Sequence, residues 1–145
     1  MLRGGSSASA KERRGVLDAG VVLVRLDRRH RSHEQVRDLF DRSLRGEIDL
    51  AISAVNLAEV FQHAHRYSTE TGLDPAALLT SLRVSVRSPG IDAARRAAAL
   101  CTMADASLAD RFAVATAHLA RARLYTTDGS LAQAARKEGI RVTRL

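Results

Sequence analysis

The chain has 145 residues, of which 46% are hydrophobic and 27% charged, an ordinary composition for one globular domain with its own core. It contains no uncharged apolar run of roughly 18 residues and no apolar segment near its start of the kind that directs secretion, so we expect a cytoplasmic protein that does not span a membrane. The formal net charge of +7 favours a polyanionic partner, and nucleic acid is the first candidate. A solvated basic surface accounts for this charge equally well. The aromatic content of 3% argues against a surface on which nucleic-acid bases stack.

The start of the chain divides into a tail and an ambiguous apolar segment. Residues 1–14 are polar, rich in glycine and serine and then basic, so we expect a disordered basic tail followed by a single domain over 15–145. The apolar segment 15–26 is compatible with two structures. It can form a short strand that ends at Asp18 with a helix after it, or one longer strand, which the β-branched valines of the segment favour equally.

From residue 28 onward, helical and strand patterns alternate along the chain. Apolar residues at helical spacing, helix starts at Asn56 and Ser107 and helix-ending glycines predict helices at 28–44, 56–67, 75–82, 92–105, 107–122 and 130–139. Short apolar runs predict strands at 48–54, 83–88, 122–128 and 140–145. This alternation predicts an α/β fold in which helices cover both faces of a parallel sheet.

Four acidic residues are placed where a parallel sheet of this kind has its working edge. Asp18 and Asp128 each follow an apolar strand, while Glu59 and Asp110 lie in the first turns of predicted helices. In open α/β sheets the binding crevice lies at the carboxyl ends of the strands. We therefore expect these four side chains to face one edge of the sheet.

Each acid also has a purely structural explanation. The spacings from Asn56 to Glu59 and from Ser107 to Asp110 fit a capping box, in which the acid binds the amide of the cap residue. The two acids that follow strands are equally suited to turns or helix caps. For any one acid alone the structural explanation is the better one, and only the combination favours a shared site.

Four stretches of the sequence resemble, in their order and spacing, the acidic motifs of PIN-domain nucleases: VLDAG at 16–20, SAVNLAEV at 53–60, SLADRFAVATA at 107–117 and YTTDGSLAQAA at 125–135. The resemblance covers residues 15–145. Compact bacterial chains of this kind are similar to the VapC toxins of type II toxin–antitoxin systems.

The resemblance implies a PIN-like three-layer α/β/α sandwich around a central, mainly parallel sheet. It places Asp18, Glu59, Asp110 and Asp128 at the positions of the family's acidic cluster. It also implies a ribonuclease that depends on Mg²⁺ or Mn²⁺, with RNA as substrate, a cognate antitoxin as partner and a homodimer as the usual assembly.

The four carboxylates also suit the expected reaction, the hydrolysis of a phosphodiester bond. Hydrolysis of a phosphodiester needs an activated water, neutralisation of a charged transition state and stabilisation of the leaving oxygen, and divalent metals held by carboxylates supply all three. Our hypothesis is that Asp18 and Asp110 anchor the principal metal, while Glu59 and Asp128 complete its shell, hold a second metal or orient the attacking water. The sequence contains no glycine-rich phosphate loop, no dinucleotide fingerprint and no nucleophile elbow, which excludes the enzyme classes built on them.

One position departs from the family pattern. Gly20 stands two residues after Asp18, where the family often carries Ser, Asn or Thr, so a hydroxyl or amide near the metal is missing from that position. The alternative function is therefore a catalytically weak PIN-like binding module, which acts through its complex with an antitoxin and operator DNA. Metal-dependent cleavage of RNA separates the two.

Overall fold

The computed structural model describes residues 12–71, 74–103 and 105–145. Most of the predicted tail, residues 1–11, lies outside the described residues. Arg14 already belongs to the first strand and is paired with Asp49, so the sheet begins one residue before the predicted domain boundary.

Five parallel strands form the centre of the molecule, in the order β3-β2-β1-β4-β5. They are β1 (Arg14–Leu17), β2 (Asp49–Ser53), β3 (Ser85–Arg87), β4 (Arg123–Thr126) and β5 (Val142–Arg144). Each of the last four lies within a stretch that the sequence pattern predicts as strand, and the predicted parallel sheet is confirmed. Because β1 occupies the middle position, its carboxyl end lies between the ends of β2 and β4.

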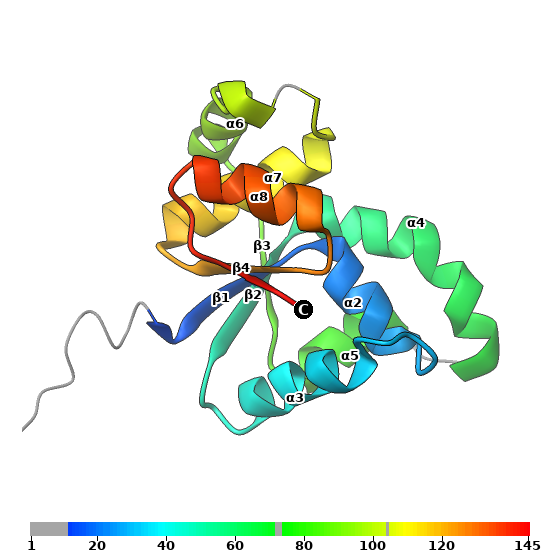
Figure 1. Ribbon diagram of the computed structural model, residues 1–145. Helices are drawn as coiled ribbons and strands as arrows, with labels where there is room; N and C mark the ends of the chain where they lie inside the picture. Colours follow the sequence, from blue (N-terminus) through cyan, green and yellow to red (C-terminus); the bar gives the residue numbers. More distant parts are fainter. Residues whose placement is uncertain (1–11, 72–73, 104) are drawn as a thin grey trace, which may run out of the picture.

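Helices cover both faces of this sheet, as Figure 1 shows. On one face lie α2 (Ala19–Leu26), α3 (His33–Leu44), α4 (Ala54–Thr71) and α5 (Pro75–Ser81). On the other lie α7 (Leu108–Ala120) and α8 (Gly129–Lys137), with α6 (Ile91–Ala98) beside α7. The predicted three-layer α/β/α sandwich is confirmed. None of the described helices is long and apolar enough to cross a membrane.

Two hydrophobic cores, one on each face, hold the layers together. Successive strand residues point to opposite faces, so Leu17 and Tyr125 belong to the core under α2–α5, while Val16 and Leu124 belong to the core under α7 and α8. All four side chains are at most 6% exposed. The strands read as continuous apolar runs because both faces of the sheet are covered.

The ambiguous segment 15–26 forms a short strand followed by a helix. β1 ends at Leu17 and α2 begins at Ala19, with Asp18 between them as the helix cap. The Asp18 carboxylate accepts a hydrogen bond from the Val21 N–H at 3.1 Å, which satisfies one of the free amides at the start of α2. The valines of α2 are buried in the first core, and this burial outweighs their weak preference for strand.

The prediction of one long helix over 92–105 is wrong. α6 ends at Ala98, and a short 3₁₀ turn follows at Cys101–Met103. The Ala98 carbonyl accepts a hydrogen bond from the Arg111 guanidinium at 3.0 Å. Leu100 and Met103 are 3% and 2% exposed in the second core. Tertiary contacts therefore end the helix although its alanines favour a longer one.

α3 begins at His33 and not at residue 28 as predicted. In the loop before it, Asp27 Oδ1 accepts the Arg29 N–H at 3.1 Å. Such local bonds between a side chain and the backbone compete with helix formation. The loop thus separates α2 from α3.

α4 begins at Ala54, two residues before its predicted start, so the prediction that Asn56 caps this helix is wrong. Instead, the Ser53 hydroxyl accepts a hydrogen bond from the Val55 N–H at 3.2 Å and so pairs one backbone amide at the start of the helix. Asn56 lies inside the first turn of α4 and is fully buried. Its side chain is therefore available for a tertiary contact.

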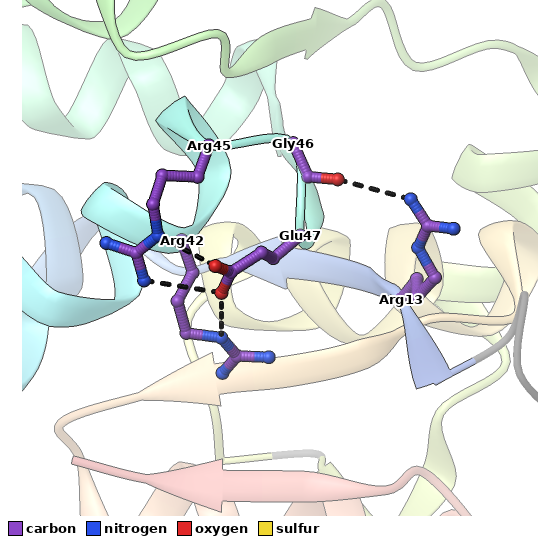
Figure 2. Close-up of polar contacts among 5 residues, drawn as sticks. All are labelled: Arg13, Arg42, Arg45, Gly46 and Glu47. Atoms are coloured by element: carbon purple, nitrogen blue, oxygen red, sulfur yellow. Dashed lines mark hydrogen bonds and ion pairs between the residues drawn. The ribbon is translucent and has the colours of Figure 1, made fainter.

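A polar cluster fixes the turn between α3 and β2 (Figure 2). Glu47 Oε1 accepts a hydrogen bond from Arg45 at 2.7 Å, and Glu47 also lies 3.9 Å from the Arg42 guanidinium. The hydrogen bond to Arg45 lowers the pKa of the exposed Glu47 carboxyl. Arg13 donates to the Gly46 carbonyl at 3.1 Å, which connects the start of β1 to this turn. Gly46 has φ +75°, a conformation that glycine adopts without strain.

Candidate active site

Asp18 stands at the carboxyl end of β1, in the middle of the sheet. Its N–H donates to the Tyr125 carbonyl at 3.2 Å, which extends the pairing of β1 with β4 beyond the strand. The side chain is 6% exposed. Its Oδ1 accepts from the Val21 N–H, and its Oδ2 accepts from the Thr126 hydroxyl. Asp18 is thus both a helix cap and a buried acid.

Burial raises the pKa of Asp18 from 3.8 to about 6. The two hydrogen bonds to the carboxylate oppose this increase, and the negative charges of Asp110 and Asp128 add to it. Since those two carboxylates act on Asp18, three of the four predicted site residues lie within electrostatic range of one another. An adjacent cation would relieve the cost of holding them charged.

Asp128 is held next to Asp18 by Thr126. Thr126 is the last residue of β4 and is fully buried. Its hydroxyl donates to Asp18 Oδ2 and accepts the Asp128 N–H at 3.0 Å. Asp128 Oδ1 in turn accepts the N–H groups of Ser130 at 2.8 Å and Leu131 at 3.3 Å, so Asp128 caps α8. The second oxygen of this exposed carboxylate, Oδ2, takes part in neither of these bonds.

Asp110 is brought to the same edge by the contact between α4 and α7. The Asn56 side chain donates to the Ala109 carbonyl at 3.0 Å and so joins the first turns of the two helices. The Ser107 hydroxyl accepts the Asp110 N–H at 3.1 Å, so the predicted cap of α7 is confirmed. Partial burial raises the pKa of Asp110; the negative charge of Asp128 adds to this, and contacts with Ser107 oppose it.

Glu59 lies on α4, three residues after Asn56. Partial burial raises its pKa, the charge of Asp110 adds to the increase, and His63, one turn further along the helix, opposes it. Asp110 therefore acts electrostatically on both Glu59 and Asp18. The four acids come from four separate segments of the chain, and the charge of Asp110 connects Glu59 with Asp18.

The donor atoms in this region suit a hard divalent cation. All four candidates are carboxylates, and Mg²⁺ and Mn²⁺ prefer oxygen ligands of this kind. Over the residues that the structure describes, no group of three or more His, Cys, Asp or Glu side chains is arranged to hold an ion directly. Mg²⁺ is commonly bound through one or two carboxylates and keeps several of its waters. The residues present thus fit a hydrated ion.

A cavity of about 280 Å³ opens beside two of the acids. Its lining includes Asp110 and Asp128, together with the apolar side chains of Met103 and Leu131. A larger cavity, of about 590 Å³, lies along α6 and α7 and contains none of the four acids. The smaller cavity therefore provides the space next to the candidate site.

Two residues of this region were not predicted from the sequence. Thr126 is indistinguishable in the sequence from other β-prone residues of its strand, and the threonine pair before Asp128 is the one available signal. Asn56 resembles a helix cap, and its role depends on a carbonyl 53 residues away. Its Oδ1 is buried and has no hydrogen-bond partner among the described residues.

Comparisons with known structures agree with this fold. A DNA-bound VapBC complex from Salmonella typhimurium is similar at a TM-score of 0.68 and 17% identity, covering 90% of this chain and 97% of that one. The sarcin–ricin loop cleaving toxin VapC20 of Mycobacterium tuberculosis is similar at 0.63 and 18%, covering 83% and 94%. A toxin–antitoxin complex from Klebsiella pneumoniae is similar at 0.59 and 23%, covering 81% and 89%.

At these identities the structural likeness shows the fold alone. Comparison with curated protein sequences finds no match. The family model of the PIN domain matches residues 15–137, which is well over half of the chain. This match and the observed sandwich agree with the resemblance of the acidic motifs, and the chain belongs to the PIN domain family.

Proposed function

We propose that this protein is a metal-dependent endoribonuclease that acts as the toxin of a toxin–antitoxin pair. The observation that supports the proposal is electrostatic: the charges of Asp110 and Asp128 act on Asp18, and the charge of Asp110 acts on Glu59. Burial and this mutual repulsion raise the pKa of Asp18, Glu59 and Asp110. Such a cluster is costly without a cation, and perturbed acids of this kind mark functional sites.

The proposed roles follow from the surroundings of each acid. Asp18 and Asp110 anchor the metal, because Asp18 is the most buried and Asp110 acts electrostatically on both Asp18 and Glu59. Glu59 and Asp128 complete the site or orient the attacking water. Bound Mg²⁺ or Mn²⁺ supplies neutralisation of the scissile phosphate and a lowered pKa for water. Thr126 and the α8 amides fix the orientation of the Asp18 and Asp128 carboxylates.

The substrate and partner are proposed on the structural neighbours and on charge. VapC20, a similar structure, is a toxin that cleaves the sarcin–ricin loop, which is RNA. Other similar structures are complexes of a toxin with its antitoxin. The net charge of +7 supports binding to RNA phosphates. We therefore propose RNA as substrate and an antitoxin protein as partner, and on the resemblance to the VapC toxins we propose a homodimer as the assembly.

A second function is favoured by one specific observation. Two of the similar structures are VapBC complexes bound to DNA, one of them to a fragment of their own promoter. With Gly20 in place of a polar side chain, the protein can serve mainly as a binding module in such a complex. Metal-dependent cleavage by the isolated protein is the property that separates the two.

The test uses the purified, antitoxin-free protein, mixed structured RNAs and either Mg²⁺ or Mn²⁺, with EDTA as the metal-free condition. The key variant is Asp110→Asn. The matched control is Asp92→Asn, because Asp92 is an acid in the first turn of a neighbouring helix, α6, and lies outside the acidic cluster. Circular dichroism and analytical ultracentrifugation establish that each variant is folded and has the same oligomeric state.

We expect cleavage by the wild type and by Asp92→Asn in the presence of metal, and none with EDTA or with Asp110→Asn. Cleavage that persists in EDTA, or in Asp110→Asn, contradicts the proposed metal site. Intact RNA in every reaction, with the protein folded and metal-bound, rejects the nuclease and favours the binding module.

A further inference from the structure

The start of α2 lies close to the β4–α8 loop at Gly20, next to Asp18. Gly20 is the second residue of this helix and is partly exposed. A Cβ atom at this position would lie 3.0 Å from Thr127 Oγ1 and 3.4 Å from Asp18 Oδ1. A side chain at this position would therefore press against a hydroxyl of the β4–α8 loop and would contact the most buried of the four acids.

The backbone at Gly20 does not require a glycine. The residue is helical, and glycine inside a helix costs about 0.5–1 kcal/mol relative to alanine. By contrast, Gly46 and Gly139 have positive φ, which explains a glycine at those positions. What distinguishes Gly20 is the neighbouring hydroxyl, because a Cβ at 3.0 Å from Oγ1 would force Thr127 to move.

The hydroxyl of Thr127 is available to bind a ligand. The preceding residue, Thr126, already uses its hydroxyl to join Asp18 and Asp128. Thr127 is only partly buried, and within the described part of the chain its hydroxyl has no hydrogen-bond partner. A hydroxyl both donates and accepts, so it can bind a water molecule and orient it toward a carboxylate.

We propose that Thr127 is a positioning residue of the acidic site, whose hydroxyl orients a water beside Asp18, and that Gly20, because it has no side chain, leaves that hydroxyl its position. The inference rests on the proposed metal-dependent function, because that water belongs to the hydration shell of the divalent ion. It also explains how the site dispenses with a polar side chain at position 20: the hydroxyl is supplied from the opposite loop. Groups that orient the ligands of a metal in this way typically change its affinity about 10–100-fold when removed.

Three variants and one control test the inference. Thr127→Val removes the hydroxyl and keeps the shape, whereas Thr127→Ser keeps the hydroxyl. Gly20→Ala displaces the Thr127 hydroxyl without changing a polar group. Gly90→Ala is the matched control, because Gly90 also lies at the start of a helix, has no positive φ and has nothing within 4 Å of its added Cβ.

The measurements are the affinity for Mn²⁺ by isothermal titration calorimetry and the rate of RNA cleavage, both on the full chain. We expect Thr127→Val and Gly20→Ala to bind Mn²⁺ about tenfold or more weakly, with cleavage reduced in parallel. Thr127→Ser should stay within about threefold of wild type, because its hydroxyl can occupy the same space. Gly90→Ala should be unchanged.

The outcome separates this inference from the proposed function. The role of Thr127 is overturned if Thr127→Val binds Mn²⁺ as tightly as the wild type does. It is also overturned if Thr127→Ser binds Mn²⁺ as weakly as Thr127→Val does. Either result leaves the acidic site in place. A folded wild type that binds no Mn²⁺ overturns both.

Discussion

Replacing Asp18 by Asn should stabilise the metal-free protein at neutral and alkaline pH. The pKa of Asp18 is about 6 in the folded chain against an ordinary value of 3.8. At about 1.4 kcal/mol for each pKa unit, ionised Asp18 destabilises the fold by about 3 kcal/mol above pH 7. The folded chain keeps a proton between these two values that the unfolded chain has lost. The wild type therefore loses stability as the pH rises from about 4 to about 6.

The variant escapes this loss but gives up one contact. The Asn carbonyl can still accept the Val21 N–H, whereas its amide cannot accept the Thr126 hydroxyl that now donates to Oδ2. The lost bond costs about 1 kcal/mol. We therefore expect Asp18→Asn to be about 2 kcal/mol more stable than the wild type at about pH 8, with the difference smaller by about 1.4 kcal/mol at about pH 5.

Urea unfolding followed by circular dichroism, with EDTA throughout, measures both values. Asp74→Asn is the matched control, because Asp74 is an exposed cap of α5 that accepts the Ala77 N–H at 3.3 Å. It should not reproduce the gain at higher pH. An Asp18→Asn protein that is less stable than the wild type at both pH values would refute the reasoning, since it would show that Asp18 serves the fold mainly as a cap. Saturating Mg²⁺ should reverse the order, because it stabilises only the chain that binds it.

The other polar contacts of the site give three further predictions. Asp110→Asn should leave the metal-free protein as stable as the wild type or more so at neutral and alkaline pH, because partial burial raises the pKa of Asp110 and its charge then costs folding energy. A loss of about 1 kcal/mol in urea unfolding would assign Asp110 to the helix cap instead. Thr126→Val should lower the free energy of unfolding by about 1–3 kcal/mol, since it removes the hydrogen-bond partner of Asp18 Oδ2. Thr126→Ser keeps the hydroxyl and should recover most of the lost stability. Equal stability of the two variants would contradict the role of the hydroxyl. Asn56→Ala should cost about 1 kcal/mol or more, because the Ala109 carbonyl loses its donor, and hydrogen exchange should show faster opening where α4 meets α7.

The amino-acid sequence determined the order of the elements and the class of the fold. Helical spacing and short apolar runs are local properties, readable over a few residues, and they predicted the last four strands of the parallel sheet, while the extent of the first stayed open. The positions of the four acids relative to strand ends and helix starts were equally local. Because parallel strands end at one edge, the sequence alone also led to the prediction of a shared acidic site.

Local patterns failed where contacts distant in sequence decide the structure. The Ala-rich stretch 92–105 has good helix propensity throughout, yet it breaks after Ala98, where Arg111 binds the last carbonyl. Asn56 has the spacing of a cap residue, but a buried contact with Ala109 gives it another role. In both cases a tertiary contact outweighs the small free energies of helix propensity and capping.

The tertiary structure alone decided the polar framework of the site. The hydrogen bond from Thr126 to Asp18 joins residues 108 positions apart, and the approach of Thr127 to Gly20 spans a similar separation. Such pairs form only when β1 and β4 lie side by side in the sheet. The sequence therefore determines which types of residue carry the chemistry. The burial that raises the pKa of Asp18, and the placement of threonine hydroxyls beside it, arise only when the strands pair.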